Sequence, residues 1–235
     1  MAKIGGRSGI LDMPSLTVSS PARPLALISG ASSGIGAAFA RSLGGQGYDL
    51  ALTARRGDRL HALAEELERT CGANAFVVVQ DLSEFGAAEM ILGLVAARGR
   101  SVDMLVNNAG FSIAERFAAV PWARQRDFLM TLVVNACGLA HGVIPGMVER
   151  GRGRIVNVAS MAAFAPGVAG HSLYPGAKSL MLTFSQALDA EYRAQGLRVT
   201  AVCPGFTLTE FAQANGTDAL IDASPRRLFH TAEPV

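Results

Sequence analysis

The chain has 235 residues, of which half are hydrophobic and 17% are charged. That composition predicts a sizeable buried core and excludes a disordered, collagen-like or coiled-coil chain. The 21 lysines and arginines nearly balance the 19 aspartates and glutamates, which leaves a formal net charge of +2. Such a balance indicates neither a nucleic-acid partner nor an anionic membrane surface.

Strand and helix patterns alternate from residue 25 to about residue 202, loop-like residues follow, and we expect residues 25–235 to form one domain. Apolar runs predict strands at 25–29, 49–53, 76–79, 104–106, 155–158 and 199–202. Helical patterns fall between them, up to about residue 43, around 60–67, and near 86–98, 122–150 and 174–195. This alternation predicts an α/β fold: a single doubly wound, Rossmann-like parallel sheet of six strands, covered on both faces.

Cysteine usage and the apolar stretches bear on location. Cys71, Cys137 and Cys203 suit neither a secreted disulfide framework nor a metal site, so we expect a reducing, cytoplasmic setting and no metal. Residues 1–24 lack the apolar stretch of a signal peptide and are predicted to form a mobile leader. Two uncharged stretches, 128–148 and 155–177, carry polar and helix-breaking residues at their centres, so we expect no membrane span.

A glycine-rich turn follows the first predicted strand. Residues 29–36 read SGASSGIG, with glycines at positions 30, 34 and 36. Glycine there permits a tight turn and lets backbone N–H groups approach a pyrophosphate at the start of the next helix. The spacing alone is weak evidence, and a merely structural turn is the alternative. Its place between a strand and a helix favours a dinucleotide site.

The residues after the second predicted strand bear on cofactor choice. Ala54 stands where an NAD site usually has an acidic residue, and Arg55 and Arg56 follow it. A guanidinium is a planar cation with several donors and suits a 2′-phosphate. Two solvated loop arginines are the alternative. The pattern favours NADP(H) over NAD(H).

Tyr174 and Lys178 lie four residues apart and share one face of a predicted helix. A phenol is a poor base at neutral pH, but a neighbouring cation favours the phenolate and lowers its pKa. An ordinary surface pair is the alternative, although Lys178 is one of only two lysines in the chain. The pair therefore indicates an acid–base site.

Together these motifs resemble the short-chain dehydrogenase/reductase family over residues 25–211. Residues 29–36 resemble its TGxxxGIG turn, Asp81 and Leu82 its adenine-contacting pair, 107–110 its NNAG motif, and 203–209 the stretch beside the nicotinamide. Asn135, Ser160, Tyr174 and Lys178 resemble its catalytic tetrad. The residues thereby expected to bind the cofactor are Gly30, Ser32, Ser33, Gly34, Ile35, Gly36, Arg55, Arg56, Asp81, Leu82, Asn108, Ala109, Gly110, Tyr174, Lys178, Pro204, Gly205, Thr207 and Thr209.

The resemblance implies an NADP-dependent oxidoreductase in which the cofactor carries the hydride. Tyr174 would exchange a proton with the substrate oxygen, and Ser160 would hydrogen-bond that oxygen. Lys178 would lower the pKa of Tyr174 and hold the nicotinamide ribose, and Asn135 would position a water that links Lys178 to solvent. Family members usually continue through a further helix and a seventh strand, so the resemblance also implies loss of that strand and an exposed sixth edge.

Apolar residues expected around the pocket mouth indicate a small, apolar carbonyl or alcohol substrate, although core packing explains them equally. They are Met161, Phe164, Leu173, Phe206 and Phe211. Apolar helix faces at 122–150 and 174–195 resemble the family's dimer contact and indicate a homodimer or homotetramer. Two alternatives remain: an NADP-binding sensor or scaffold without turnover, and a lyase or epimerase that uses the same site.

Overall fold

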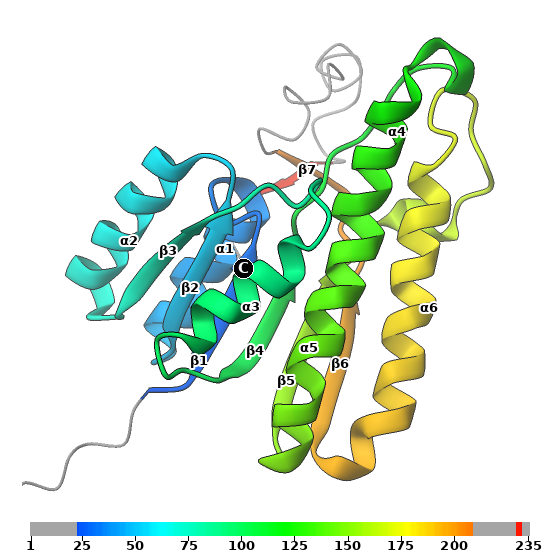
Figure 1. Ribbon diagram of the computed structural model, residues 1–235. Coiled ribbons are helices and arrows are strands. Elements are labelled where there is room, and N and C mark those ends of the chain that lie inside the picture. Colours follow the sequence, from blue (N-terminus) through cyan, green and yellow to red (C-terminus); the bar gives the residue numbers. More distant parts are fainter. Residues whose placement is uncertain (1–22, 209–228, 232–235) are drawn as a thin grey trace, which may run out of the picture.

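A computed structural model describes residues 23–208 and 229–231, whose main body is a parallel sheet flanked by helices (Figure 1). The six strands run in the order β3-β2-β1-β4-β5-β6, and each neighbouring pair is parallel. They are β1 (Leu25–Ser29), β2 (Asp49–Ala54), β3 (Ala75–Val79), β4 (Val102–Asn107), β5 (Gly153–Val158) and β6 (Leu197–Val202). The predicted doubly wound fold is confirmed. The strand order reverses between β1 and β4, which is where such sheets bind ligands.

The helices form a layer on each side of the sheet (Figure 1). Helices α1 (Gly34–Gly45) and α2 (Gly57–Cys71) share one apolar cluster with the sheet. Helices α3 (Ala87–Ala96), α5 (Asn135–Glu149) and α6 (Tyr174–Tyr192) pack against the other face. Helix α4 (Trp122–Leu129) runs through a π-helical turn, η2 (Met130–Val134), into α5, so the predicted helix at 122–150 is one rod with an irregular middle. Short 3₁₀ turns are η1 (Phe117–Ala119), η3 (Met161–Phe164) and η4 (Arg193–Gln195).

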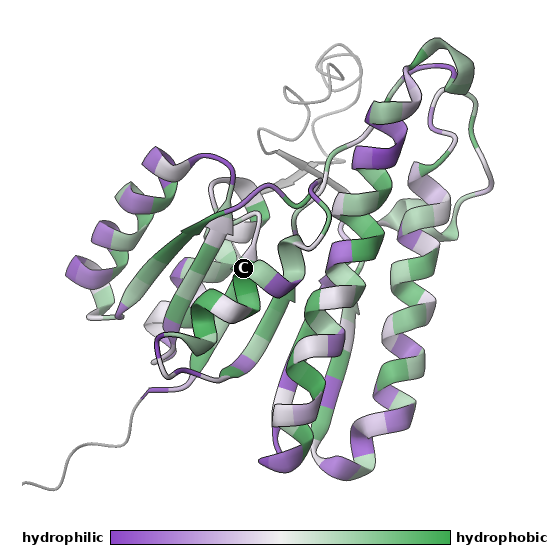
Figure 2. Cartoon of the chain, viewed as in Figure 1, coloured by the Kyte–Doolittle hydropathy of each residue, from purple (hydrophilic) through white to green (hydrophobic). Residues whose placement is uncertain are grey.

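The central strands are the most deeply buried elements of the described structure. Leu27 in β1, Leu52 in β2 and Leu105 in β4 have no exposed surface. Figure 2 shows the apolar strands enclosed between helices, with the polar residues of α2 turned outward. Burial of these side chains contributes most of the favourable free energy of folding. Because all six strands are parallel, their carboxyl ends lie at one edge of the sheet.

One face of β5 and β6 departs from the prediction of a sheet covered on both sides. Arg154, Arg198 and Thr200 are exposed on the side that carries α1 and α2, and they alternate with buried residues. Within residues 23–208, no helix covers this face, and β6 is the edge strand. Alternation of polar and apolar residues is typical of a strand with one solvated face, so full coverage was a wrong prediction for these two strands.

Two short strands follow β6. β7 (Phe206–Leu208) and β8 (Phe229–Thr231) pair in parallel as a separate two-stranded sheet. The sequence analysis predicted no strand in this region.

One described helix is long and apolar enough to cross a membrane by length and composition. It is the α4–α5 rod, Trp122–Glu149, and half of its most apolar window is buried inside the protein. Its inner face includes Leu139, Val143 and Met147, which belong to the main core cluster. The second uncharged stretch, 155–177, is divided among β5, η3, a loop and the start of α6.

Arg23 ties two helix ends together just before β1. Its guanidinium donates hydrogen bonds to the carbonyl oxygens of Gly44 (3.0 Å) and Gly47 (2.9 Å) at the end of α1. It also donates to the oxygens of Cys71 (3.4 Å) and Gly72 (2.6 Å) at the end of α2. Helix C-termini carry unsatisfied carbonyls and partial negative charge, so one cation stabilises both ends.

Replacement of Arg23 by alanine is expected to lower the free energy of unfolding by about 1–3 kcal/mol, because four carbonyl groups lose a charged donor. Urea unfolding followed by circular dichroism measures the change. Arg152→Ala is the matched control, since that side chain is 75% exposed and its ion pair with Asp103 is 4.0 Å long. Equal stability of the two variants would contradict the bridging role of Arg23.

Candidate active site

Ser160, Tyr174 and Lys178 meet at the carboxyl end of β5. Ser160 follows that strand and caps η3, where its Oγ accepts a hydrogen bond from the Ala162 N–H at 3.1 Å. Tyr174 is the first residue of α6, and Lys178 lies one turn further along the same helix. A side-chain hydrogen bond joins Ser160 to Tyr174. The structure therefore brings together three of the four residues predicted as the catalytic set.

The Lys178 ammonium is held inside the protein. Its residue is only 6% exposed, and Nζ donates to the Val158 carbonyl oxygen at 2.8 Å. Nζ lies 5.7 Å from the centroid of the Tyr174 ring. Burial lowers the pKa of Lys178 to about 8, and the nearby Cys203 thiol acts in the opposite direction. Keeping Lys178 charged therefore costs free energy here unless further hydrogen-bond acceptors reach the ammonium.

The pKa of Tyr174 moves opposite to the prediction. Burial raises it above its usual value of 10.0, and the hydrogen bond from Ser160 lowers it by less. We expected Lys178 to lower this pKa, and the direction was wrong because removal of the phenol from water, which disfavours the phenolate, outweighs the lowering influence. At neutral pH Tyr174 therefore carries its proton.

Glycines shape the turn between β1 and α1 as predicted. Gly30 has φ of +67° and Gly34 has φ of +54°, a left-handed region that glycine tolerates best. A side chain at Gly30 would come within 2.8 Å of the Ala109 backbone, and one at Gly36 would clash with the Gly30 carbonyl. The turn therefore needs glycine, and it leaves the start of α1 facing the carboxyl edge of the sheet, a geometry that fits a pyrophosphate.

The predicted NNAG segment holds this turn in place. Asn108 Nδ2 donates to the carbonyl oxygens of Ser29 and Gly30, both at 3.1 Å. The backbone N–H groups of Asn108 and Ala109 donate to Ser29 Oγ at 3.0 and 3.1 Å. Ser29 was not among the predicted site residues, although it begins the same motif. Gly110 packs closely against Leu132, where a side chain would come within 3.3 Å.

A buried amide network lies directly below the site. Asn107 Nδ2 donates to the Ala136 carbonyl oxygen (3.0 Å) and to Asn157 Oδ1 (2.9 Å). Asn157 Nδ2 donates in turn to Ser185 Oγ at 2.8 Å. This network joins β4, β5, α5 and α6, and the sequence analysis missed it. The polar Asn157 in an otherwise apolar strand was the one available signal, because buried polar groups need partners.

The arginines after β2 differ in their contacts. Arg56 donates to Ser32 Oγ from Nε (3.2 Å) and from Nη2 (3.0 Å), and its Nη2 donates to Ser33 Oγ at 2.7 Å. Arg55 is 71% exposed and lies 3.9 Å from an Asp81 oxygen. A guanidinium and two hydroxyls thus gather beside the glycine turn. This donor set fits a phosphate ester at the end of β2.

Asp81, Leu82 and Asn135 build the loop between β3 and α3. Asp81 Oδ1 accepts from the Ser83 N–H at 2.9 Å, and Leu82 is buried in the core. Asn135 Nδ2 donates to the carbonyls of Leu82 and Glu84, both at 2.9 Å, and its Oδ1 accepts from the Ala88 N–H at 3.1 Å. These hydrogen bonds join both polar ends of the Asn135 side chain to this loop. The resemblance had led us to expect that Asn135 positions a water instead.

The last predicted cofactor residues follow β6. The Pro204 carbonyl oxygen accepts from the Met161 N–H at 3.0 Å, which fixes this segment beside Ser160. Gly205 is exposed, Thr207 belongs to β7, and Thr209 lies outside the described residues. Ile35 packs partly against the core beside α1. Within residues 23–208 and 229–231, no group of three or more His, Cys, Asp or Glu side chains is placed to hold a metal ion.

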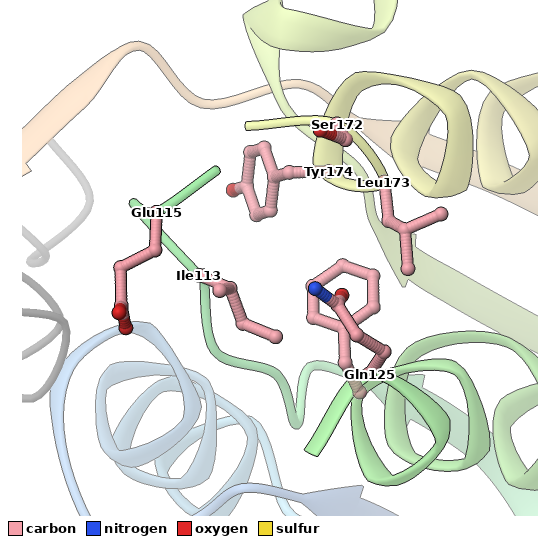
Figure 3. A pocket seen from close by; sticks show the side chains of 7 residues that line it. Ile113, Glu115, Gln125, Ser172, Leu173 and Tyr174 are labelled. Carbon is pink, nitrogen blue, oxygen red and sulfur yellow. The ribbon is translucent and has the colours of Figure 1, made fainter. Parts of the chain in front are cut away.

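A pocket opens beside Tyr174, between two segments that are distant in sequence (Figure 3). Its lining comprises Ile113, Glu115, Gln125, Phe128, Ser172, Leu173 and Tyr174. Of the predicted apolar lining, Leu173 is present, whereas Met161 (56% exposed) and Phe164 (64% exposed) are not part of this pocket. The Phe206 side chain and Phe211 lie outside the described part of the chain. The polar lining residues Glu115 and Gln125 were not predicted.

Comparisons with known proteins agree with this geometry. The chain matches the short chain dehydrogenase family over residues 24–219. It is 35% identical to an uncharacterized oxidoreductase of Myxococcus xanthus over 190 residues, or 81% of this chain and 74% of that protein. It is also 35% identical to a serine 3-dehydrogenase of Agrobacterium fabrum over 188 residues, or 79% of this chain and 72% of that protein.

A solved short-chain dehydrogenase from Sphingobium yanoikuyae in complex with NADPH has the same fold, with a TM-score of 0.80 at 33% identity over 89% of this chain and 80% of that one. The chain therefore belongs to the short-chain dehydrogenase/reductase family. It is an oxidoreductase that uses a nicotinamide cofactor to transfer a hydride to or from a small substrate.

The buried ammonium makes a testable contribution to stability. The pKa of Lys178 is about 8 in the folded protein against 10.5 for a solvated lysine, so the unfolded chain binds more protons between these values. Folding is therefore penalised below pH 8, and the penalty disappears as pH rises toward 10.5. From pH 8 to 10, the unfolding free energy of wild type relative to Lys178→Met should rise by at most about 1.4 kcal/mol per pH unit. Parallel pH profiles of the two proteins in chemical unfolding would contradict the burial of a charged Lys178.

Proposed function

We propose that the protein is an NADP(H)-preferring carbonyl reductase or alcohol dehydrogenase in which Tyr174 is the general acid–base. The main support is that Tyr174, Ser160 and the buried Lys178 lie together beside a pocket. They lie at the same edge of the sheet as the glycine turn, whose geometry fits a pyrophosphate. When bound, the nicotinamide cofactor supplies or accepts the hydride. The protein's own residues bind, orient and exchange the proton.

Tyr174 donates its proton to the carbonyl oxygen during reduction and accepts one from the alcohol during oxidation. Because burial keeps its pKa raised, the phenol is protonated at neutral pH, which suits donation to a carbonyl. The Ser160 hydroxyl donates its one proton to the Tyr174 oxygen in the cofactor-free protein, and it would turn that donor to the substrate oxygen when a substrate is bound. Together the two hydroxyls fix that oxygen and stabilise the charge that develops on it.

Lys178 provides a cation whose charge is poorly solvated. One of its three N–H donors is used by the Val158 carbonyl, which leaves donors for the nicotinamide ribose and for a water. A cavity beside Lys178 is lined by Asn107, Thr131 and Ala136, among others. Asn135 adjoins Ala136, so we propose that it positions this part of the helix and, through it, a water that passes protons to Lys178.

The preference for NADP(H) is supported by Arg56 and its two serine partners. The Arg56 guanidinium and the hydroxyls of Ser32 and Ser33 gather after the carboxyl end of β2, where the 2′-phosphate of NADP(H) would be expected. No acidic residue occupies that end of the strand. The similar structure from Sphingobium yanoikuyae contains NADPH, in line with this assignment. Arg55, the neighbour of Arg56 in sequence, is a second cation after β2, and its side chain is 71% exposed.

We also propose a compartment, an oligomeric state and a substrate class for the protein. Three cysteines, an odd number, do not suit a secreted disulfide framework, which supports a cytoplasmic enzyme. Polar and helix-breaking residues within the two uncharged stretches support the absence of a membrane span. Exposed apolar residues on the two long helices, such as Val134 and Leu180, support a homodimer or homotetramer. The substrate is a small carbonyl or alcohol compound with a largely apolar body, which Ile113, Phe128 and Leu173 would contact.

Replacement of Tyr174 by phenylalanine should lower kcat with a carbonyl panel by about 10²–10⁴-fold, because the proton donor is lost. NADPH binding, measured by fluorescence titration, should be nearly unchanged. Wild-type protein that binds NADPH but oxidises it with no carbonyl would favour the sensor or scaffold. Product formed without net cofactor consumption would favour a lyase or epimerase.

Replacement of Arg56 by alanine should weaken NADPH binding about tenfold or more, because the phosphate loses a charge-assisted donor. The dissociation constant of NADH, which lacks this phosphate, should hardly change. Arg69→Ala serves as the control, because Arg69 is an exposed arginine in the last turn of α2, the helix that Arg56 precedes. An equal loss of affinity for both cofactors would contradict the assignment of Arg56 to the 2′-phosphate.

A further inference from the structure

A side-chain hydrogen bond joins the segment after β4 to the loop before α6. Ser112 Oγ and His171 Nδ1 lie 3.3 Å apart, and the hydroxyl donates or accepts according to the tautomer of the imidazole. Ser112 is 5% exposed, and a buried hydroxyl needs hydrogen-bond partners. The two residues are 59 positions apart in the chain, so the bond is a tertiary contact between two loops. It plays no part in the chemistry assigned to Tyr174, Ser160 and Lys178.

The His171 end of this bond leads directly to Tyr174. The Tyr174 N–H donates to the His171 carbonyl oxygen at 3.2 Å, at the point where α6 begins. The His171 N–H donates in turn to the Val168 carbonyl oxygen at 3.0 Å. A hydrogen bond on the His171 side chain therefore restrains the residue that accepts from the first N–H of α6, and Tyr174 is the first residue of that helix.

The Ser112 end leads to the turn that fits the cofactor. Ser112 follows the segment in which Asn108 Nδ2 donates to the Gly30 carbonyl oxygen at 3.1 Å. The backbone N–H of Asn108 also donates to Ser29 Oγ at 3.0 Å. The chain is thus fixed to the glycine turn shortly before it reaches Ser112. The Ser112–His171 bond connects this fixed segment to the start of α6.

The neighbours of Ser112 on both sides in sequence also face the start of α6. Phe111 packs edge-on against Phe128 with ring centroids 5.6 Å apart, and the Phe128 ring lies 6.5 Å from that of Tyr174. Figure 3 shows Ile113 across the pocket from Tyr174. The hydrogen bond therefore lies within the contact between the two segments that border the pocket.

We propose that Ser112 and His171 are positioning residues, whose hydrogen bond sets Tyr174 relative to the segment that holds the glycine turn. Proton and hydride transfer need the phenol, the substrate oxygen and the cofactor at fixed separations, and a misplacement of about 1 Å can cost about 10²-fold in rate. Without the bond, the start of α6 would be less restrained, whereas the contacts between Asn108 and the glycine turn would remain. This proposal rests on the proposed function of Tyr174.

Two variants of His171 isolate the hydrogen bond from the shape of the side chain. Asparagine and leucine branch alike and place an atom where Nδ1 stands, but only asparagine can form a hydrogen bond there. His171→Leu should lower kcat for carbonyl reduction about 3- to 10-fold, as expected for the loss of one hydrogen bond, and His171→Asn should retain most of the rate. Ser112→Ala should match His171→Leu, and the double variant should be no slower than either. His61→Leu, at an exposed histidine on α2, is the control and should leave kcat unchanged.

Two further measurements show whether the effect passes through Tyr174. In protein labelled with ¹³Cζ-tyrosine, the Tyr174 signal should move or broaden in Ser112→Ala and in His171→Leu, and it should stay at its wild-type position in His171→Asn. Fluorescence titration should give the same NADPH affinity for all three variants as for the wild type. A fall in kcat with an unchanged Tyr174 signal, or with an equal fall in NADPH affinity, would overturn the positioning role.

The spectrum also separates this proposal from the one on which it rests, because it needs no turnover. The expected pattern of Tyr174 signals in protein that reduces no carbonyl would overturn the assigned activity and keep the positioning role. Turnover that is equal in the wild type and His171→Leu, or equally reduced in His171→Leu and His171→Asn, would overturn the positioning role and keep the activity.

Discussion

A single ammonium group held out of water constrains the rest of the site. Lys178 is almost wholly buried, and its Nζ donates a hydrogen bond to one backbone oxygen, that of Val158. Burying a charge is costly, and the lowered pKa of about 8 expresses that cost. Lys178 lies near the start of α6, one helical turn from Tyr174 and next to the end of β5. A ligand oxygen that accepted a hydrogen bond from Lys178 would therefore be bound more strongly than at a solvated lysine.

The parallel sheet makes this arrangement possible. Every strand ends at the same edge of the sheet, so the glycine turn after β1, the arginines after β2 and Ser160 after β5 all lie along that edge. Buried amides then fix their spacing. Asn108 holds the glycine turn to β4, and Asn107 and Asn157 join β4 to β5. Small shifts of one strand would consequently alter the cofactor turn and the acid–base pair together.

The sequence predicted the six strands, their parallel direction and the meeting of Tyr174 with Lys178, because apolar periodicity and motif spacing are local signals. It did not predict the exposed face of β5 and β6, since coverage depends on which helices reach a strand. The direction of the Tyr174 pKa was also missed, because burial is a property of the packed molecule and not of a four-residue spacing. Glu115 and Gln125 lie on a loop and a short helix whose approach to Tyr174 is set by the tertiary fold.

The titration of Tyr174 tests the central claim most directly, namely that burial holds its proton and Ser160 moderates that effect. The chain has only three tyrosines, so NMR of ¹³Cζ-tyrosine protein can follow each phenol, with Tyr174→Phe to assign the signal. We expect Tyr174 of the cofactor-free protein to titrate above 10, and higher still in Ser160→Ala. Titration below 10 in the wild type, or no change on removing the Ser160 hydroxyl, would contradict the claim.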